Sequence, residues 1–281
     1  MGKFTGVLLA SDFDNTLVYT QAAMTSGASA PPLSEENRTA LEYFMAEGGR
    51  FAIATGRALS TFRYYAASLP KNTPCILSCG AALYDFETEQ YLEYLGLDEP
   101  AARFAAEVME RFPSVALEIY YPAETIYAVR PNAISRNFRR PGISRVEVPT
   151  LADAPMPIGT LLFVDERETL EQVKAYLSER GADDAYELVF SANILLEFTA
   201  KGADKGNMVR HLADRLGISM EHVYCVGDEA NDLPMLSIAA QGFAPANCAQ
   251  AVREAGIATI VADVRESALA EVVAILDKKY S

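Results

Sequence analysis

Residues 7–17 read Val-Leu-Leu-Ala-Ser-Asp-Phe-Asp-Asn-Thr-Leu, and this stretch decides how the chain is organised. Its apolar run, 7–10, has the length and continuity of a parallel strand that is buried on both faces. Asp12, Asp14 and Thr16 follow at alternate positions, just past the end of that strand, where open α/β sheets hold their reactive groups. Two carboxylates this close repel one another unless a cation or a proton lies between them, so the stretch predicts a site for a divalent metal.

The flanking sequence alternates strands and helices. Ser34 is a predicted N-cap, with Glu35 and Glu36 in the first turn, where negative charge suits the helix dipole. The further elements that we expect are strands at 50–54, 75–78 and 223–226 and helices at 59–69 and over Met208, Val209, Leu212 and Leu216. Strands that alternate with helices predict a parallel sheet with helices on both faces, a Rossmann-like, doubly wound α/β core.

The middle of the chain has a different pattern. Strands are expected at 116–121 and 125–130, joined by a turn at Pro122, and at 146–148, 160–164 and 195–198, with helices at 99–112 and 168–180. Neighbouring strands with few helices predict an α+β unit on an antiparallel sheet. We therefore expect a core of residues 1–84 and 199–281 and an inserted α+β domain of residues 85–198.

Length and charge limit the partners of the protein. A chain of 281 residues, half of them hydrophobic, suits two domains or one domain with an insertion. Its 24 basic and 38 acidic residues give a net charge of −14, which argues against nucleic acid and anionic membranes as partners. No apolar run reaches the roughly 18 residues of a membrane span, and no leader pattern opens the chain. We expect a cytoplasmic protein with no membrane partner; the sequence leaves its oligomeric state open.

The four cysteines, Cys75, Cys79, Cys225 and Cys248, lack the spacing of a redox pair or a zinc site. We expect them to be buried free thiols in a reducing compartment, which agrees with the cytoplasmic prediction.

Three further loops carry reactive groups. Thr55-Gly56-Arg57 offers a hydroxyl and backbone N–H groups to a phosphate oxygen, Lys205-Gly206 begins a helix, and residues 227–232 read Gly-Asp-Glu-Ala-Asn-Asp after a strand. Each loop taken alone suits an ordinary turn, a solvated lysine or a helix cap, and residues 12–16 alone suit a solvated acidic turn. Their order along the predicted sheet brings all four loops to one edge.

These motifs resemble those of the haloacid-dehalogenase-like superfamily of phosphohydrolases, in particular its Cof-type, subfamily IIB members. Residues 12–16 resemble the first family motif, Thr55-Gly56-Arg57 the second, Lys205-Gly206 the third and residues 227–232 the fourth, and Leu233-Pro234-Met235-Leu236 is similar to the continuation. The middle unit takes the place of a IIB cap domain. The chain departs from the pattern at Cys79-Gly80, where members often carry Asn-Gly. Of two Lys-Gly pairs, at Lys201 and Lys205, Lys205 fits the motif better because an apolar helix follows it.

The resemblance implies a Mg²⁺-dependent phosphatase that acts on a small phosphomonoester, in the first place a sugar phosphate. It implies Asp12 as the nucleophile that forms an aspartyl phosphate, Asp14 as general acid and base, and Lys205 as a cation that relieves the repulsion between the two anions. Phosphate oxygens would be held by Thr16, Thr55, Gly56 and Asn231, and Mg²⁺ by Asp12, Asp14 (through its backbone carbonyl), Asp228 and Asp232.

Two questions stay open at this level. A phosphotransferase or phosphomutase would use the same intermediate, and a signalling domain that only accepts phosphate is a third, less favoured interpretation because it has no need of a cap. The basic cluster Arg136, Arg139, Arg140 and Arg145 of the inserted domain suits either a solvated loop or contacts to a second anionic or hydroxyl-rich part of the substrate.

Overall fold

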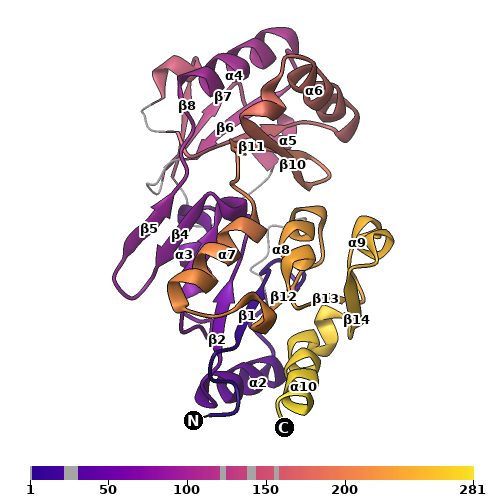
Figure 1. The fold of residues 1–281 in the computed structure, drawn as a ribbon. Coiled ribbons are helices and arrows are strands. Elements are labelled where there is room, and N and C mark those ends of the chain that lie inside the picture. The colour runs from indigo at the N-terminus through magenta and orange to yellow at the C-terminus, as the bar shows by residue number, and fades with distance from the viewer. Residues whose placement is uncertain (1, 22–30, 121–124, 138–143, 155–157) are drawn as a thin grey trace.

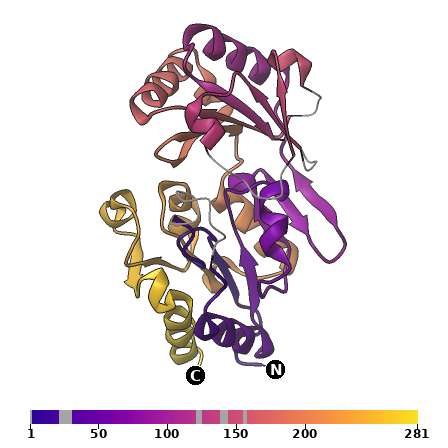
Figure 2. The ribbon, with the colours of Figure 1, turned by 180° about the vertical axis from the view of Figure 1, so that it is seen from behind.

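A computed structural model describes residues 2–21, 31–120, 125–137, 144–154 and 158–281, which form two lobes (Figure 1). Both ends of the chain lie at the end of the core lobe that is far from the other lobe, as the views from both sides show (Figure 2). The second lobe is therefore an insertion within the core lobe. The strands and helices that alternate in the core confirm the predicted α/β class with an inserted unit.

The core lobe is built on five parallel strands in the order β14-β13-β12-β1-β2. Their bounds are β1 Leu8–Ser11, β2 Arg50–Ile53, β12 Val223–Val226, β13 Gln241–Pro245 and β14 Ala258–Val261. Ser11 at the end of β1 lies opposite Val226 of β12 and Ile53 of β2. Three strands thus end at the same level, which brings the loops that follow them to one edge of the sheet.

Helices cover both faces of this sheet. Leu9 of β1 lies in one cluster of buried side chains with Phe44 and Leu276, whereas its neighbour Leu8 lies in another with Met208 and Leu212. Successive strand residues point to opposite faces, so β1 is buried on both sides, as its apolar run predicted. The helices are α2 Glu35–Ala46, α3 Leu59–Ala66 and α10 Ala268–Lys279 on the first side, and α7 Lys205–Leu216, α8 Leu233–Ile238 and α9 Gln250–Ala255 on the second.

Ser34 caps α2 as predicted: its hydroxyl oxygen accepts a hydrogen bond from the Asn37 N–H at 3.3 Å. Next to β2, the strand β3 Cys75–Leu77 forms an antiparallel sheet with β4 Ala82–Asp85 and β5 Gln90–Tyr94. A parallel bridge between Ala54 and Ile76 connects the two sheets. The β4–β5 hairpin was not among the predicted elements.

The second lobe, the cap, holds a six-stranded sheet in the order β10-β11-β9-β6-β7-β8. Its elements are β6 Ala116–Tyr120, β7 Thr125–Val129, β8 Ser144–Val148, β9 Thr160–Val164, β10 Tyr186–Ala192, β11 Leu195–Ala200, α4 Glu99–Arg111, α5 Ala133–Asn137 and α6 Arg167–Glu179. All neighbouring pairs are antiparallel except β7 and β8. The strands predicted at 116–121, 125–130, 160–164 and 195–198 are confirmed within a few residues, β10 was not predicted, and the turn at Pro122 lies outside the described residues.

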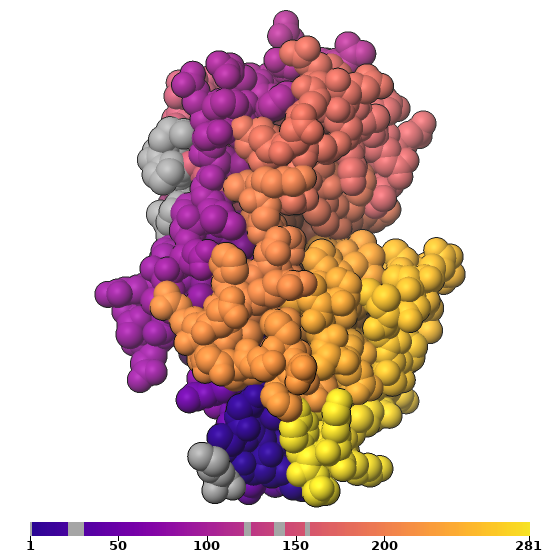
Figure 3. Space-filling model, in the orientation of Figure 1, coloured from indigo at the N-terminus to yellow at the C-terminus, as the bar shows by residue number. Residues whose placement is uncertain are grey.

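The two faces of the cap sheet have different neighbours. On one face, Phe163 and Phe198 pack in a cluster with Val108 of α4 and Val173 of α6. On the other, cap side chains such as Leu162 and Leu195 share a cluster with Ala58 of the core lobe. The lobes touch in Figure 3, where β11 and the segment that follows it, in orange, run from the cap into the core. The cap sheet therefore lies over the loop edge of the core, with α4 and α6 on the face that is turned away.

Two predicted boundaries fall inside sheets. The boundary at 84/85 cuts β4, which belongs with β3, and the boundary at 198/199 cuts β11 of the cap sheet. Both boundaries were predicted where the pattern of side chains changes along the sequence. A strand ends only where its backbone hydrogen bonds to the neighbouring strands end, which explains both differences. Among the described residues, no helix has both the length and the apolar character to cross a membrane.

Candidate active site

Asp12 lies directly after β1 and is joined to the third motif by a short ion pair. Its Oδ1 is 2.6 Å from Lys205 Nζ, and the same ammonium group is 2.6 Å from Asp232 Oδ1. Lys205 is the first residue of α7, and its side chain is only 1% exposed. One buried lysine thus connects the end of β1 with the loop after β12. Lys201, the alternative lysine, lies on the exposed surface and donates to the Asp183 carbonyl at 2.7 Å.

The loop after β12 folds its acidic side chains inward. Asp232 Oδ2 accepts hydrogen bonds from the N–H groups of Asp228 at 2.9 Å and Glu229 at 3.0 Å. Thr16 donates its hydroxyl proton to Asp228 Oδ1 at 2.7 Å. These bonds satisfy buried polar groups and fix the loop against the first motif, so that residues from both ends of the chain meet.

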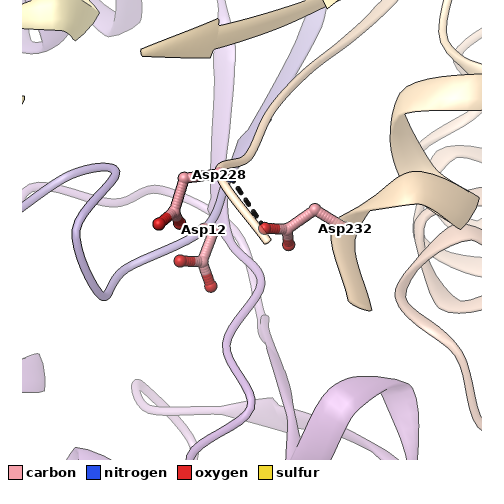
Figure 4. A group of neighbouring side chains, drawn as sticks. All are labelled: Asp12, Asp228 and Asp232. Carbon is pink, nitrogen blue, oxygen red and sulfur yellow. Dashed lines mark hydrogen bonds between the residues drawn. The ribbon is translucent and has the colours of Figure 1, made fainter. Parts of the chain in front are cut away.

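Asp12, Asp228 and Asp232 form a buried group of carboxylates whose ligand atoms lie within 4.8 Å of one another. Figure 4 shows Asp12 and Asp228 side by side, with Asp232 turned towards them. Lys205 supplies one positive charge against three negative ones. Oxygen ligands and an unbalanced charge of about two match a hard divalent cation such as Mg²⁺, so this donor set fits a metal ion.

Burial dominates the protonation of these groups. It raises the pKa of Asp12 to about 7; the charges of Asp232 and Asp14 act in the same direction, and Lys205 acts against them. Burial, followed by the charges of Asp12 and Asp232, likewise raises the pKa of Asp228 well above its ordinary value. Burial alone would lower the pKa of Lys205, but Asp12 and Asp232 outweigh it and raise that pKa. The cluster holds more negative charge than its lysine can balance.

Asp14 is held apart from the three carboxylates. Arg57 binds it through two contacts, Nε to Oδ2 at 2.7 Å and Nη2 to Oδ1 at 2.6 Å, and Thr20 donates to Oδ1 at 2.7 Å. The guanidinium group also lies over the rings of Phe13 and Tyr65, 5.2 Å and 4.7 Å from their centres. A bidentate, stacked arginine fixes the direction of the carboxylate as well as its charge.

The second motif meets the fourth through Cys79. The Thr55 hydroxyl accepts a hydrogen bond from the Arg57 N–H at 3.1 Å, and the Thr55 carbonyl accepts one from the Cys79 N–H at 3.1 Å. The Asn231 amide donates to Cys79 Sγ at 3.3 Å. Burial, and after it the charge of Glu197, raises the pKa of the Cys79 thiol well above its ordinary value. The cysteine is therefore a neutral packing group and not a nucleophile.

Two glycines permit close contact around Lys205. Gly80 has φ of +100°, and a Cβ there would lie 2.2 Å from the Asp204 carbonyl oxygen. A Cβ on Gly206 would lie 2.6 Å from the Pro234 carbonyl oxygen. Asp204 caps α7 by accepting from the Asn207 N–H at 2.8 Å. Both glycines are needed for the backbone to bring Lys205 to the carboxylates.

The structure brings most of the predicted site residues together at one edge of the sheet. Hydrogen bonds link five of them in series: Asp12, Lys205, Asp232, Asp228 and Thr16. Thr55, Gly56 and Asn231 surround Cys79 beside them.

The arginines of the predicted cap cluster that the structure describes are paired within the cap. Arg136 makes an exposed pair with Glu147 at 2.8 Å on the side of β8, at the opposite edge of the cap sheet from β10. Arg145 donates to the Ser135 carbonyl at 2.8 Å. Arg139 and Arg140 lie outside the described residues.

Sequence reasoning missed two side chains at the site. Arg57 was assigned only to a phosphate-binding turn, although a basic residue two positions after Thr55 was a signal that it could face the acidic loop. No motif of the sequence includes Glu197 of β11, yet its Oε1 would lie 3.6 Å from a Cβ on Gly56. The alternation of apolar residues in β11 placed Glu197 on one face of a strand, but only the docking of the cap shows what that face meets.

Comparison with known proteins agrees with this geometry. Residues 9–273 match a family model described as haloacid dehalogenase-like hydrolase. YxeH of Bacillus subtilis strain 168 is 29% identical over 261 residues, 88% of this chain and 90% of the relative. From the same organism, 5-amino-6-(5-phospho-D-ribitylamino)uracil phosphatase YcsE is 24% identical over 249 residues, 88% of this chain and 86% of the relative. The structure of the HAD subclass IIB sugar phosphatase BT4131 has a TM-score of 0.78 at 20% identity and covers 98% of this chain and 100% of its own.

Proposed function

This chain belongs to the haloacid dehalogenase-like hydrolases as a Cof-type phosphatase, a phosphoric monoester hydrolase, and we propose that it is Mg²⁺-dependent and cleaves a small phosphomonoester, in the first place a sugar phosphate. The observation that carries the proposal is the contact of Asp12 and Asp232 with one buried lysine beside Asp228. This arrangement offers a nucleophilic oxygen, a fixed cation and a donor set for a metal within one cluster of side chains.

The chemistry begins at Asp12. One of its carboxylate oxygens attacks phosphorus, the bond from phosphorus to the ester oxygen breaks, and an aspartyl phosphate forms on Asp12. Lys205 holds positive charge beside Asp12 and so relieves the repulsion between the carboxylate and the phosphoryl oxygens. The hydroxyls of Thr16 and Thr55, the backbone of Gly56 and the amide of Asn231 would hold those oxygens in the attack geometry.

Asp14 carries the proton. It protonates the leaving oxygen in the first half of the reaction and takes a proton from water in the second, when that water attacks phosphorus and releases inorganic phosphate from Asp12. Arg57 and Thr20 fix the direction of its carboxyl group. Because Arg57 contacts both oxygens and favours the ionised form, one of these contacts must open before Asp14 can carry a proton.

Asp12, Asp228 and Asp232 would hold Mg²⁺, together with the backbone carbonyl of Asp14. When bound, the ion supplies charge neutralisation for the phosphoryl group. The raised pKa values of Asp12 and Asp228 support the same assignment, because three buried carboxylates and one lysine leave negative charge to be balanced.

Transfer of the phosphoryl group to a second hydroxyl, as in a phosphotransferase or phosphomutase, is the alternative. It differs in the second half of the reaction alone, where an alcohol replaces water. The names of a sugar phosphatase and of a phosphatase for a phosphorylated ribityl compound among the similar proteins favour hydrolysis over transfer.

We propose the domain division with its two boundaries moved, so that the cap begins after Tyr94 and ends after Ala200, as the membership of the sheets supports. Four buried free thiols support a reducing, cytoplasmic location.

The test is a phosphate-release assay over a panel of phosphorylated metabolites with Mg²⁺. We expect wild-type protein to release inorganic phosphate and Asp12→Asn to lose activity by a factor of about 10⁴ or more, because the amide cannot form the covalent intermediate. Asp183→Asn, an exposed change of the same kind, is the matched control and should retain full activity. Equal release by the wild type and Asp12→Asn would overturn the catalytic assignment, and phosphate found on an added alcohol would favour transfer.

A further inference from the structure

Strand β11 presents its side chains alternately to the two faces of the cap sheet. Leu196 and Phe198 pack into the cap core beneath α4 and α6, so Leu195 and Glu197 point to the opposite face. Leu195 on that face packs in one cluster with Ala58 of the core lobe. Because β11 is paired on both sides, with β9 and β10, its backbone holds Glu197 in a fixed direction towards the core.

Glu197 lies beside the second motif, next to the candidate active site. A Cβ placed on Gly56 would lie 3.1 Å from Cys79 Sγ, 3.6 Å from Asn231 Nδ2 and 3.6 Å from Glu197 Oε1. A carboxylate of the cap and an amide of the core thus meet at one point beside the second motif. Glu197 is 6% exposed, so its carboxylate lies in the interface between the lobes and away from bulk water.

The direction of the reaction brings the leaving group to the side of the site that faces the cap. Asp12 stands at the end of β1, and in an in-line displacement the bond that breaks lies opposite the attacking oxygen. The leaving group therefore extends away from the core sheet, towards the face of the cap that carries Glu197.

A buried carboxylate at this position discriminates by charge and by hydrogen bonding. It accepts hydrogen bonds from hydroxyl or ammonium groups, and it repels a second negative charge more strongly than it would in water. A site that accepts such bonds favours ligands that can make them over ligands that cannot.

We propose that Glu197 is the specificity-determining residue for the leaving group, and that it selects phosphomonoesters whose leaving group donates hydrogen bonds and carries no negative charge. This inference rests on the proposed phosphatase function and deepens it. Sugar and polyol phosphates belong to the selected class, whereas phosphoesters with a carboxylate next to the phosphate are excluded.

The test compares kcat/KM for a hexose 6-phosphate, 2-phosphoglycolate and p-nitrophenyl phosphate in wild-type protein and in Glu197→Gln, with Mg²⁺ present. We expect the preference for the hexose phosphate over phosphoglycolate to fall by about tenfold to a hundredfold in the variant, because loss of the charge weakens the selected bonds and removes the repulsion. Hydrolysis of p-nitrophenyl phosphate, whose leaving group donates no hydrogen bond, should change by less than about threefold. Glu107→Gln, on α4 at the far side of the cap, is the matched control.

The outcomes are distinct. A preference in Glu197→Gln within twofold of that of the active wild-type enzyme would overturn this inference and leave the phosphatase function standing. If the wild type hydrolysed none of the three esters, the inference and the proposed function would both be wrong. Glu197→Asp keeps the charge but shortens the side chain; it should still reject phosphoglycolate while losing hexose phosphate activity, and it serves if Glu197→Gln does not fold.

Discussion

Arg57 determines the geometry of Asp14. The guanidinium group lies over two aromatic rings and makes two hydrogen bonds to the carboxylate, so the proposed general acid has one orientation and one partner of opposite charge. A lysine would keep the charge but lose the two-pronged contact.

We predict that Arg57→Lys lowers kcat at least tenfold for an alkyl phosphomonoester and much less for p-nitrophenyl phosphate, whose phenolate leaves without help from an acid. Steady-state rates on the two esters measure this difference. Arg63→Lys, a more exposed change in α3, should leave both rates unaltered. Equal losses on both esters would indicate that Arg57 acts by holding the fold and not by positioning Asp14.

Cys79 shows what the sequence could tell and what it could not at the level of one residue. The cysteine at the position where family members often carry asparagine was visible at once. Its backbone has φ of +53°, a region that asparagine adopts more readily than cysteine, and its sulfur accepts from Asn231. The role of the thiol depends on a contact between two loops that are distant in sequence, and no local pattern encodes that contact.

At the scale of elements, the loop after β3 and the start of α7 are locked together. Gly80 lies against the carbonyl group of Asp204, the residue that caps α7 immediately before Lys205. Any side chain at Gly80 must displace the beginning of the helix that carries the lysine.

We predict that Gly80→Ala destabilises the protein by about 3 kcal/mol or more, from backbone strain and from overlap with Asp204 together, and lowers phosphatase activity through displacement of Lys205. Gly217→Ala is the control: Gly217 ends α7 with φ of +68° and has no atom within 4 Å of its added Cβ, so strain alone should cost about 1–2 kcal/mol. Denaturant unfolding measures both. Equal losses of stability would show that the contact with Asp204 is readily relieved.

The sequence predicted helices and strands well where the pattern of apolar residues was clear. Leu8 and its neighbours form a buried strand because they are apolar on both faces, and Lys205 was preferred to Lys201 because an apolar helix follows it. The β4–β5 hairpin and β10 were missed because their strands carry polar and aromatic residues whose partners come from tertiary pairing. The contacts of Arg57 and Glu197 likewise depend on residues of other elements, which only the tertiary structure brings together.

At the scale of the molecule, the active site has an excess of negative charge that a divalent cation would neutralise. Three buried carboxylates face one lysine, inside a chain with a net charge of −14. The folded protein without metal therefore carries repulsion that a bound ion relieves.

We predict that Mg²⁺ at about 100 times its Kd stabilises the fold by about 2.7 kcal/mol, which raises Tm by several degrees, and that a chelator reverses the shift. In Asp228→Asn the Tm measured without metal should rise, because one repelling charge is gone, and the response to Mg²⁺ should disappear. Thermal unfolding with and without the ion tests both effects, with Asp183→Asn as the control. A response to Mg²⁺ that survives in Asp228→Asn would contradict the assigned ligand set.

The short path of the chain from β11 into α7 has a consequence for how this enzyme could diversify. Glu197 of β11 and Lys205 of α7 are only a few residues apart in the chain. The proposed specificity residue and the lysine that would neutralise the phosphoryl oxygens are therefore positioned by one short segment of backbone. An inserted or deleted residue between them would disturb selectivity and chemistry at once. New substrate preferences should therefore arise by replacement of side chains in the cap strands, while the length of this segment stays constant.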